Sequence, residues 1–313
     1  MTDGITPALN ADALYTKSQL YIRRALLRKT SDEMDEYQLW ASLSLELLGK
    51  SSLSSHHPSL IADPQHFQSL FAAAGINAST DIKTITAKTL YERLQHLIRP
   101  FDDKLKHFCN QMANRRNAEL HSGEAPFQAI RLEAWEAEFW YATDVILQDM
   151  GSTLEEWLGS DDASLPKEIL TNARQAKTQS VILRVERTQE EFQKQKKSVR
   201  ELAIQKSHQK SIIDYPRLFS LLSGVEWEVN CPSCTSKAYI AGIQIEEVVV
   251  DTTEDQYAIW EIVERQYSGE QFHCPTCGLR LEGYDELQAA GVECDFAETD
   301  EREMEYEPEY GND

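Results

Sequence analysis

The sequence predicts a mainly α-helical protein with a small β domain at its C-terminal end. Three observations lead to this prediction. Apolar side chains recur at helical spacing over the first 160 residues. Residues 164–210 are dominated by lysine, arginine and glutamine, as in an exposed helix. Beyond Gly224 the apolar period changes to two, which is the period of β-strands.

Composition and charge limit the classes to which the protein can belong. A chain of 313 residues can form two domains with cores. It has no apolar run near the ~18 residues that span a bilayer, and its start lacks the pattern of a signal peptide. We therefore expect a cytoplasmic protein without a membrane segment. The net charge of −21 argues against a simple nucleic-acid coat protein.

The charge is nevertheless distributed unevenly along the chain. Residues 164–210 carry 11 basic and 5 acidic side chains, whereas residues 285–313 carry 1 basic and 12 acidic ones. The basic segment either grips a phosphate backbone or is a solvated helix that connects two domains. The tail from Glu298 onward has little to bury, and we expect it to be disordered.

The expected helices of the first 160 residues have short connections, as in a helical bundle. The second of them is nearly all apolar, which predicts that it is buried. Start signals such as Asp63-Pro64 and stop signals such as Gly75 set the boundaries. The expected helices are Ala13–Arg28, Asp35–Gly49, Asp63–Gly75, Thr86–Ile98, Asp102–Leu120 and Phe127–Met150.

A β-hairpin is expected in the C-terminal part. A turn at Asp251–Asp255 separates a first strand from a second run, Tyr257–Tyr267. Residues 279–281 and a short helix at Asp285–Ala290 follow. The apolar residues expected on one side of the first strand are Tyr239, Ala241, Ile243, Ile245 and Val249.

Two Cys-x-x-Cys pairs, Cys231/Cys234 and Cys274/Cys277, flank this hairpin. The hairpin would bring the pairs together, and four thiolates complete a closed tetrahedral zinc site. Such a site is structural, because no coordination position remains for a substrate. Two unrelated pairs or an iron centre are the alternatives. The expected segments are a helical bundle at 1–160, a basic helical arm at 161–212, a zinc ribbon at 213–297 and an acidic tail at 298–313.

The stretch from Asn114 to Pro126, "NRRNAELHSGEAP", places cations and an imidazole where a helix is expected to end. Cleaving RNA without a metal needs a base, an acid and a cation beside the phosphate. Imidazole can serve as base or acid, and guanidinium binds phosphate oxygens in a fork. Asn117 and His121 share a helix face, whereas Arg116 joins them only if the helix unwinds near Ser122. By spacing alone, a solvated helix end with a capping histidine is the favoured interpretation.

Arg116-Asn-Ala-Glu-Leu-His121 resembles the Arg-Asn-x-x-x-His motif of HEPN-domain ribonucleases. Tyr37–Lys50, "YQLWASLSLELLGK", resembles their buried second helix, so the likeness covers roughly the first 150 residues. It implies a metal-independent endoribonuclease that leaves a 2′,3′-cyclic phosphate and a 5′-OH. It also implies a homodimer in which two motifs line one cleft. By this resemblance Arg116 stabilises the phosphorane, His121 is the base or the acid, and Asn117 orients one of these two side chains.

The resemblance also implies biological partners. Many members of this family are toxins or anti-phage defence effectors, so RNA is the expected substrate and a protein antitoxin or defence protein an expected partner. Other members have lost catalysis. The alternative function is therefore a non-catalytic HEPN-like dimeric adaptor whose zinc ribbon binds a partner protein or nucleic acid. A DNA-binding regulator is a weaker hypothesis, because residues 211–284 carry 4 basic and 12 acidic side chains.

Three further residues are accessory candidates for the RNA site. Arg115 offers a second cation, and Glu119 lies within the motif itself. Glu46 interrupts the apolar second helix. It either tunes the site or forms an i,i+4 ion pair with Lys50, and the ion pair is the favoured interpretation.

Overall fold

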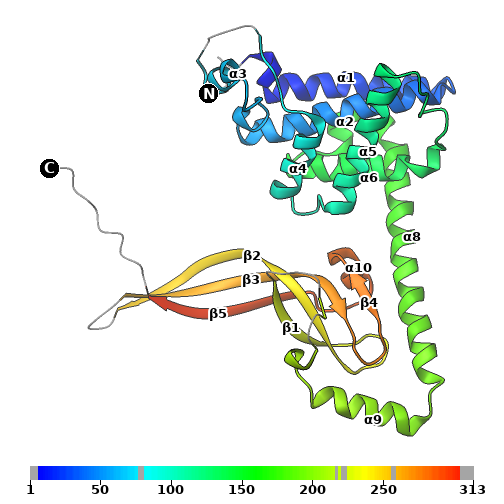
Figure 1. Ribbon diagram of the computed structural model, residues 1–313, viewed down its shortest axis with the longest axis vertical. Helices are drawn as coiled ribbons and strands as arrows, with labels where there is room; N and C mark the ends of the chain where they lie inside the picture. The colour runs from blue at the N-terminus through cyan, green and yellow to red at the C-terminus, as the bar shows by residue number, and fades with distance from the viewer. Residues whose placement is uncertain (1–5, 77–80, 216–217, 220–223, 255–258, 304–313) are drawn as a thin grey trace. The chain divides into compact units, whose positions relative to one another are not determined.

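The computed structural model describes residues 6–76, 81–215, 218–219, 224–254 and 259–303. The chain forms two compact units, residues 1–173 and residues 174–313. The first is helical, and the second combines helices with an antiparallel sheet (Figure 1). The mainly α fold with a small C-terminal β region is thus confirmed. No helix in the described part of the chain is long and apolar enough to cross a membrane.

The first unit is a helical bundle built around α2, which packs against α1, α4, α5 and α6. Tyr37, Leu45 and Leu48 of α2 are fully buried, so the expected buried second helix is confirmed. A 3₁₀ turn at Pro7–Leu9 precedes the first helix, and 3₁₀ turns at Pro58–Leu60 and Leu132–Ala134 lie between helices. The helices are α1 (Ala11–Thr30), α2 (Met34–His56), α3 (Phe67–Ala73), α4 (Ala87–Leu97), α5 (Asp103–His121), α6 (Glu136–Asp149), α7 (Leu154–Leu158) and the start of α8 (Ser160–Gln193).

Two helices begin later than the sequence predicts. Helix α3 begins at Phe67 rather than Pro64, because the Asp63 carboxylate accepts a hydrogen bond from the backbone two residues later and forms a turn. Helix α6 begins at Glu136 rather than Phe127. Phe127 is buried within a turn, so its apolar side chain reaches the interior without helical backbone.

The second unit contains a five-stranded sheet, which the end of α8 and α9 precede in the chain. The strand order is β1-β2-β3-β4, and β5 also pairs with β3. Helix α10 (Tyr284–Ala289) follows β4, and a 3₁₀ turn at Ile212–Asp214 precedes the sheet. The expected hairpin is β2–β3, although β2 continues through most of the expected turn, and residues 255–258 lie outside the described part. The other elements are the end of α8, α9 (Lys197–His208), β1 (Val225–Asn230), β2 (Lys237–Glu254), β3 (Ile259–His273), β4 (Arg280–Glu282) and β5 (Asp295–Glu303).

The helical arm predicted at 161–212 packs on the sheet through part of its length. Val181 and Phe192 of α8 are buried in the same apolar cluster as Phe272 of β3. Arg184 of α8 donates to the Glu286 carboxylate of α10 at 2.9 Å. The last part of α8 is therefore a structural component of the second unit.

Register shifts break the apolar alternation predicted for β2. The pairing with β3 slips between Gln244 and Glu246 and again between Val249 and Asp251. Each slip marks a bulge, where an extra residue changes which face the following side chains occupy. Ile245, predicted to share one side of the strand with Tyr239 and Ala241, is instead exposed at the first bulge, whereas those two residues are buried.

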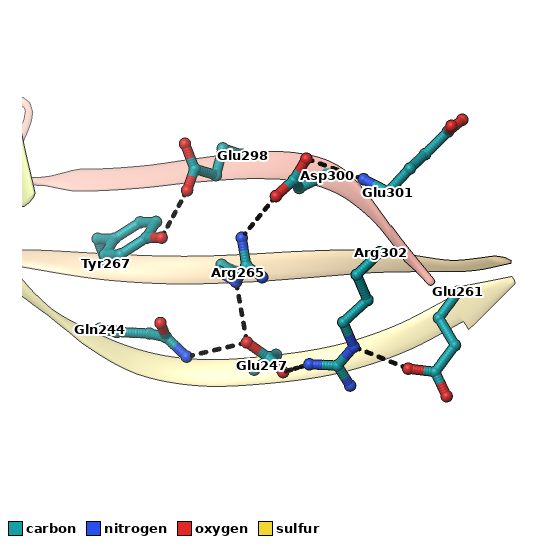
Figure 2. A network of polar contacts seen from close by, with 9 residues as sticks. All are labelled: Gln244, Glu247, Glu261, Arg265, Tyr267, Glu298, Asp300, Glu301 and Arg302. Carbon is teal, nitrogen blue, oxygen red and sulfur yellow. Dashed lines mark hydrogen bonds and ion pairs between the residues drawn. The ribbon is translucent and has the colours of Figure 1, made fainter. Parts of the chain in front are cut away.

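The prediction of a disordered tail from Glu298 is wrong for residues 298–303, which form the second half of β5. Figure 2 shows why an acidic strand can pair there. Arg265 of β3 lies between Glu247 and Asp300, at 2.9 and 3.0 Å. Arg302 of β5 pairs in turn with Glu247 and with Glu261. Charge compensation across three strands replaces the apolar burial that this segment lacks; residues 304–313 lie outside the described part.

Candidate catalytic helix end and metal centre

Helix α5 continues without a break to His121, so the unwinding expected near Ser122 does not occur within the motif. The backbone N–H and the side chain of Ser122 both donate to the Ala118 carbonyl, and this caps the helix end. Asn117 and His121 consequently share one face of α5. Five positions separate Arg116 from His121, or about 140° around the helix axis.

Arg116 is directed toward the bundle and joins α5 to α2. Its Nη1 forms an ion pair with the Glu46 carboxylate, and its Nη2 donates to Asn117 Oδ1 at 2.9 Å. The Arg116 side chain is only 11% exposed. Within one chain, the guanidinium of the motif is thus held by a carboxylate and an amide of the protein itself.

Glu46 contacts two cations rather than one. Besides Arg116, it accepts from Lys50 Nζ at 2.8 Å, which is the expected i,i+4 pair. Lys50 Nζ also donates to Thr84 Oγ1 at 3.1 Å. Burial alone would raise the pKa of the Glu46 carboxyl, but the charges of Lys50 and Arg116 outweigh it and lower that pKa. Glu46 is therefore a carboxylate that neutralises a buried cation pair.

The other motif residues differ in their surroundings. His121 is exposed, and no hydrogen bond or ion pair to another described residue involves its ring. Arg115 is partly buried, which lowers its pKa, and its Nη1 has no acceptor among the described groups. Glu119 Oε2 lies 3.5 Å from the Phe127 backbone nitrogen, so it helps to hold the loop after α5.

Sequence reasoning missed two residues beside this site. Thr84 reaches Lys50 from a segment far along the chain, and no local pattern indicates this contact. Tyr91 of α4 is fully buried. Burial first, and then the charges of Cys109 and Glu46, raise its pKa well above the ordinary value of 10.0. Tyr91 is therefore an uncharged, buried side chain near the Glu46 carboxylate.

The four paired cysteines meet at one end of the sheet. Cys231 and Cys234 follow β1, and Cys274 and Cys277 follow β3. Their sulfur atoms all lie within 4.8 Å of one another, with Cys231–Cys277 at 3.6 Å and Cys234–Cys274 at 3.5 Å. Hydrogen bonds from the other thiols lower the pKa of Cys234. This cluster can hold a metal ion, as the spacing predicted.

The two cysteine turns have the same backbone plan. In the first, the Cys231 carbonyl accepts from the N–H four residues later, and the Cys231 N–H donates five residues ahead. Cys274 makes the same two bonds in the second turn. Thr235 (φ 61°) and Gly278 (φ 79°) occupy equivalent left-handed positions. The fold therefore aims two similar pairs of sulfurs at one point.

Replacing Gly278 with alanine is expected to destabilise the second unit by about 1 kcal/mol, because alanine disfavours a left-handed backbone. Nothing lies within 4 Å of the added Cβ, so the effect comes from the backbone alone. Gly123→Ala is the matched control, since its Cβ also meets nothing and its φ is not positive. Thermal unfolding would measure both variants. Equal midpoints would contradict a backbone role for Gly278.

Comparisons of the chain with protein-family models, with curated proteins and with solved structures find no match.

Proposed function

We propose that the helical unit is a metal-independent endoribonuclease that acts as a homodimer on RNA. The observation that carries this proposal is the Arg116-Asn117-x-x-x-His121 set at the end of α5. His121 is exposed there, and its ring forms no hydrogen bond or ion pair with another described side chain. Arg115, six residues earlier on the same helix, supplies a second guanidinium for a phosphate. The resemblance to HEPN-domain ribonucleases supports the same activity.

The proposed chemistry is transesterification within the RNA. The imidazole of one His121 removes the proton from a 2′-OH, and the oxygen then attacks phosphorus. The bond from phosphorus to the 5′ oxygen breaks, and the His121 of a second protomer donates a proton to that leaving oxygen. Arg116 or Arg115 stabilises the charge on the phosphorane. Arg116 is held by Glu46. Either its side chain rotates away from α2 to reach the phosphate, or the partner protomer supplies the cation.

Purified protein is expected to cut RNA during a short incubation with EDTA, and His121→Ala is expected to slow cleavage by about 10²–10⁴-fold. His107→Ala is the matched control, because His107 is an exposed histidine on the same helix, with Gln111 as its partner. Cleavage is measured on labelled RNA, with chemical analysis of the new ends. The short incubation limits loss of metal from the cysteine cluster.

Equal cleavage by His121→Ala and the native protein would remove the ribonuclease proposal. New ends bearing a 5′-phosphate would also contradict it, because attack by a 2′-OH leaves a 5′-OH. Reduced cleavage by His107→Ala, equal to that of His121→Ala, would indicate a general effect on α5 rather than a role for one imidazole.

One observation favours a second function, a non-catalytic dimeric adaptor. In the described chain Arg116 is mostly buried and neutralised by Glu46, as expected for a residue that holds two helices together. An adaptor needs this contact but no phosphate site. Full biological activity of His121→Ala, together with loss of activity in Arg116→Ala, would support the adaptor over the ribonuclease.

We propose further that the cysteine cluster binds structural zinc. Four sulfurs placed about 2.3 Å from a tetrahedral zinc lie about 3.8 Å apart. The close sulfur pairs at 3.5 and 3.6 Å fit this spacing. Cys231, Cys234 and Cys274 are buried, and the ligand set contains no open position for substrate. The metal would stabilise the cysteine end of the sheet and take no part in RNA cleavage.

A further inference from the structure

The distal part of the sheet is a three-stranded ribbon with an unpaired edge. We define it as residues 243–254 of β2, 259–266 of β3 and 297–303 of β5. Strand β1 pairs with β2 only as far as Gly242, so from Ile243 onward β2 has β3 as its only strand neighbour among the described residues. The three strands extend together beyond β1 and β4 (Figure 1). One row of β2 backbone groups is therefore available to a further strand.

The two faces of this ribbon differ in charge. The side chains of Arg265 and Arg302 lie on one face, where they pair with Glu247, Glu261 and Asp300 (Figure 2). The register places the directly opposed residues of the three strands on shared faces. The opposite face, which we call the acidic–apolar face, carries no lysine or arginine from the described strands. It includes the acidic residues Glu246, Asp251, Glu264, Glu301 and Glu303 and the apolar residues Val248, Trp260 and Ile262.

Aliphatic side chains are exposed along the open strand. Val248 on the acidic–apolar face is 44% exposed, and Val250 at the second bulge is 52% exposed. Ile245 is the extra residue of the first bulge and is also exposed. The two bulges thus turn aliphatic side chains outward on the strand that also has the free backbone edge. Apolar groups exposed together in this way are typical of an interaction surface.

We propose that the open edge of β2 and the acidic–apolar face bind an extended, basic segment of another protein as an added strand. The backbone edge supplies hydrogen bonds. Every second side chain of the added segment lies on the acidic–apolar face, where Glu246 and Asp251 of the same edge strand select lysine or arginine. The intervening side chains lie on the opposite face, beside the exposed Val249. This binding is independent of the proposed RNA cleavage, which uses residues of the first unit.

Charge and secondary structure disfavour three other occupants of this edge: RNA, a second copy of the chain and the chain's own basic segment. RNA would be repelled by the carboxylates, because the acidic–apolar face offers no cation to a phosphate. A second copy joined edge to edge would oppose its own Glu246 and Asp251 with like charges. Three of the six lysines and arginines in residues 194–210 lie in α9, which would have to unfold before it could add as a strand.

The test uses the full-length protein and a fluorescein-labelled peptide of alternating lysine and valine. A peptide of the same composition with all lysines before all valines is the control for strand pairing. The alternating peptide is expected to bind at low salt and to slow amide exchange in residues 243–254. The Glu246→Lys/Asp251→Lys variant is expected to bind it at least roughly tenfold more weakly, because like charges across an interface oppose association.

Glu186→Lys/Glu190→Lys is the matched charge control, since both glutamates are exposed on α8 in the same unit. Thermal unfolding checks that the variants are folded. Equal weakening by both double variants, or equal binding of the two peptides, would overturn the proposal. So would protection of residues 243–254 by an RNA oligonucleotide, or a doubled molar mass that is lost in Glu246→Lys/Asp251→Lys, since each shows another occupant.

Discussion

Replacing Cys234 with serine is expected to remove zinc and to unfold the cysteine end of the second unit. Binding of structural zinc by four thiolates contributes on the order of 10 kcal/mol, which is comparable with the whole stability of a typical domain. The apolar cluster beside the cysteines is small, and the cysteines themselves form part of it. Without the metal, short strand ladders and this apolar cluster are left to hold β1 and β4 to the central hairpin. Metal analysis and amide exchange of β1–β4 measure the two effects.

Cys294→Ser is the matched control for this variant. Cys294 is also buried in the second unit but lies outside the four-sulfur cluster. We expect it to keep its zinc, and we expect both variants to leave exchange in α1–α7 unchanged, because the first unit has a separate core. Full zinc content in Cys234→Ser, with protection equal to that of Cys294→Ser, would contradict a structural metal site.

Replacing Glu46 with alanine is expected to lower the free energy of unfolding of the first unit by about 3 kcal/mol, as when one partner of a buried ion pair is removed. The loss leaves Arg116 and Lys50, each only 11% exposed, without their carboxylate. Glu36→Ala is the control, because its pair with Arg28 is solvent-exposed, and such pairs contribute less than about 1 kcal/mol. Denaturant unfolding measures both. Equal losses would show that the Glu46 contacts are no stronger than a surface pair.

The same carboxylate makes stability depend on pH. Burial acts to raise the Glu46 pKa, but Lys50 and Arg116 lower it below the ordinary value of 4.5. A group whose pKa is lower in the folded state stabilises the fold above its unfolded pKa, and this stabilisation is lost as pH falls through the folded pKa. The free energy of unfolding should therefore fall on acidification below about 4.5. Glu46→Gln should show a shallower fall over the same interval.

The local features of the fold were predictable because they depend on neighbours in the chain. The helical period placed α1, α2, α4 and α5 to within a few residues, except that α2 extends further toward its C-terminal end. The cysteine spacing predicted a cluster of four sulfurs. The i,i+4 relation predicted the pair between Glu46 and Lys50. Each of these predictions needed only the regular geometry of a helix, a hairpin or a turn.

Contacts between distant segments were not predictable in the same way. The acidic run at 298–303 looks unable to fold, because composition does not show that Arg265 lies between it and β2. The two bulges of β2 likewise change the side of Ile245 without any glycine or proline to mark them. Register depends on the partner strand, and the apolar alternation within one strand does not identify that partner.

For this protein, the sequence by itself determined the helical and β regions, the four cysteines that can hold a metal ion and the Arg-Asn-x-x-x-His order at the end of α5. Only the tertiary structure decided that Arg116 is neutralised by Glu46 and that the acidic tail begins as a strand. The physical reason is that both outcomes depend on charges brought together from segments far apart in the chain. Local spacing fixes which side chains share an element, whereas packing fixes which opposite charges they meet.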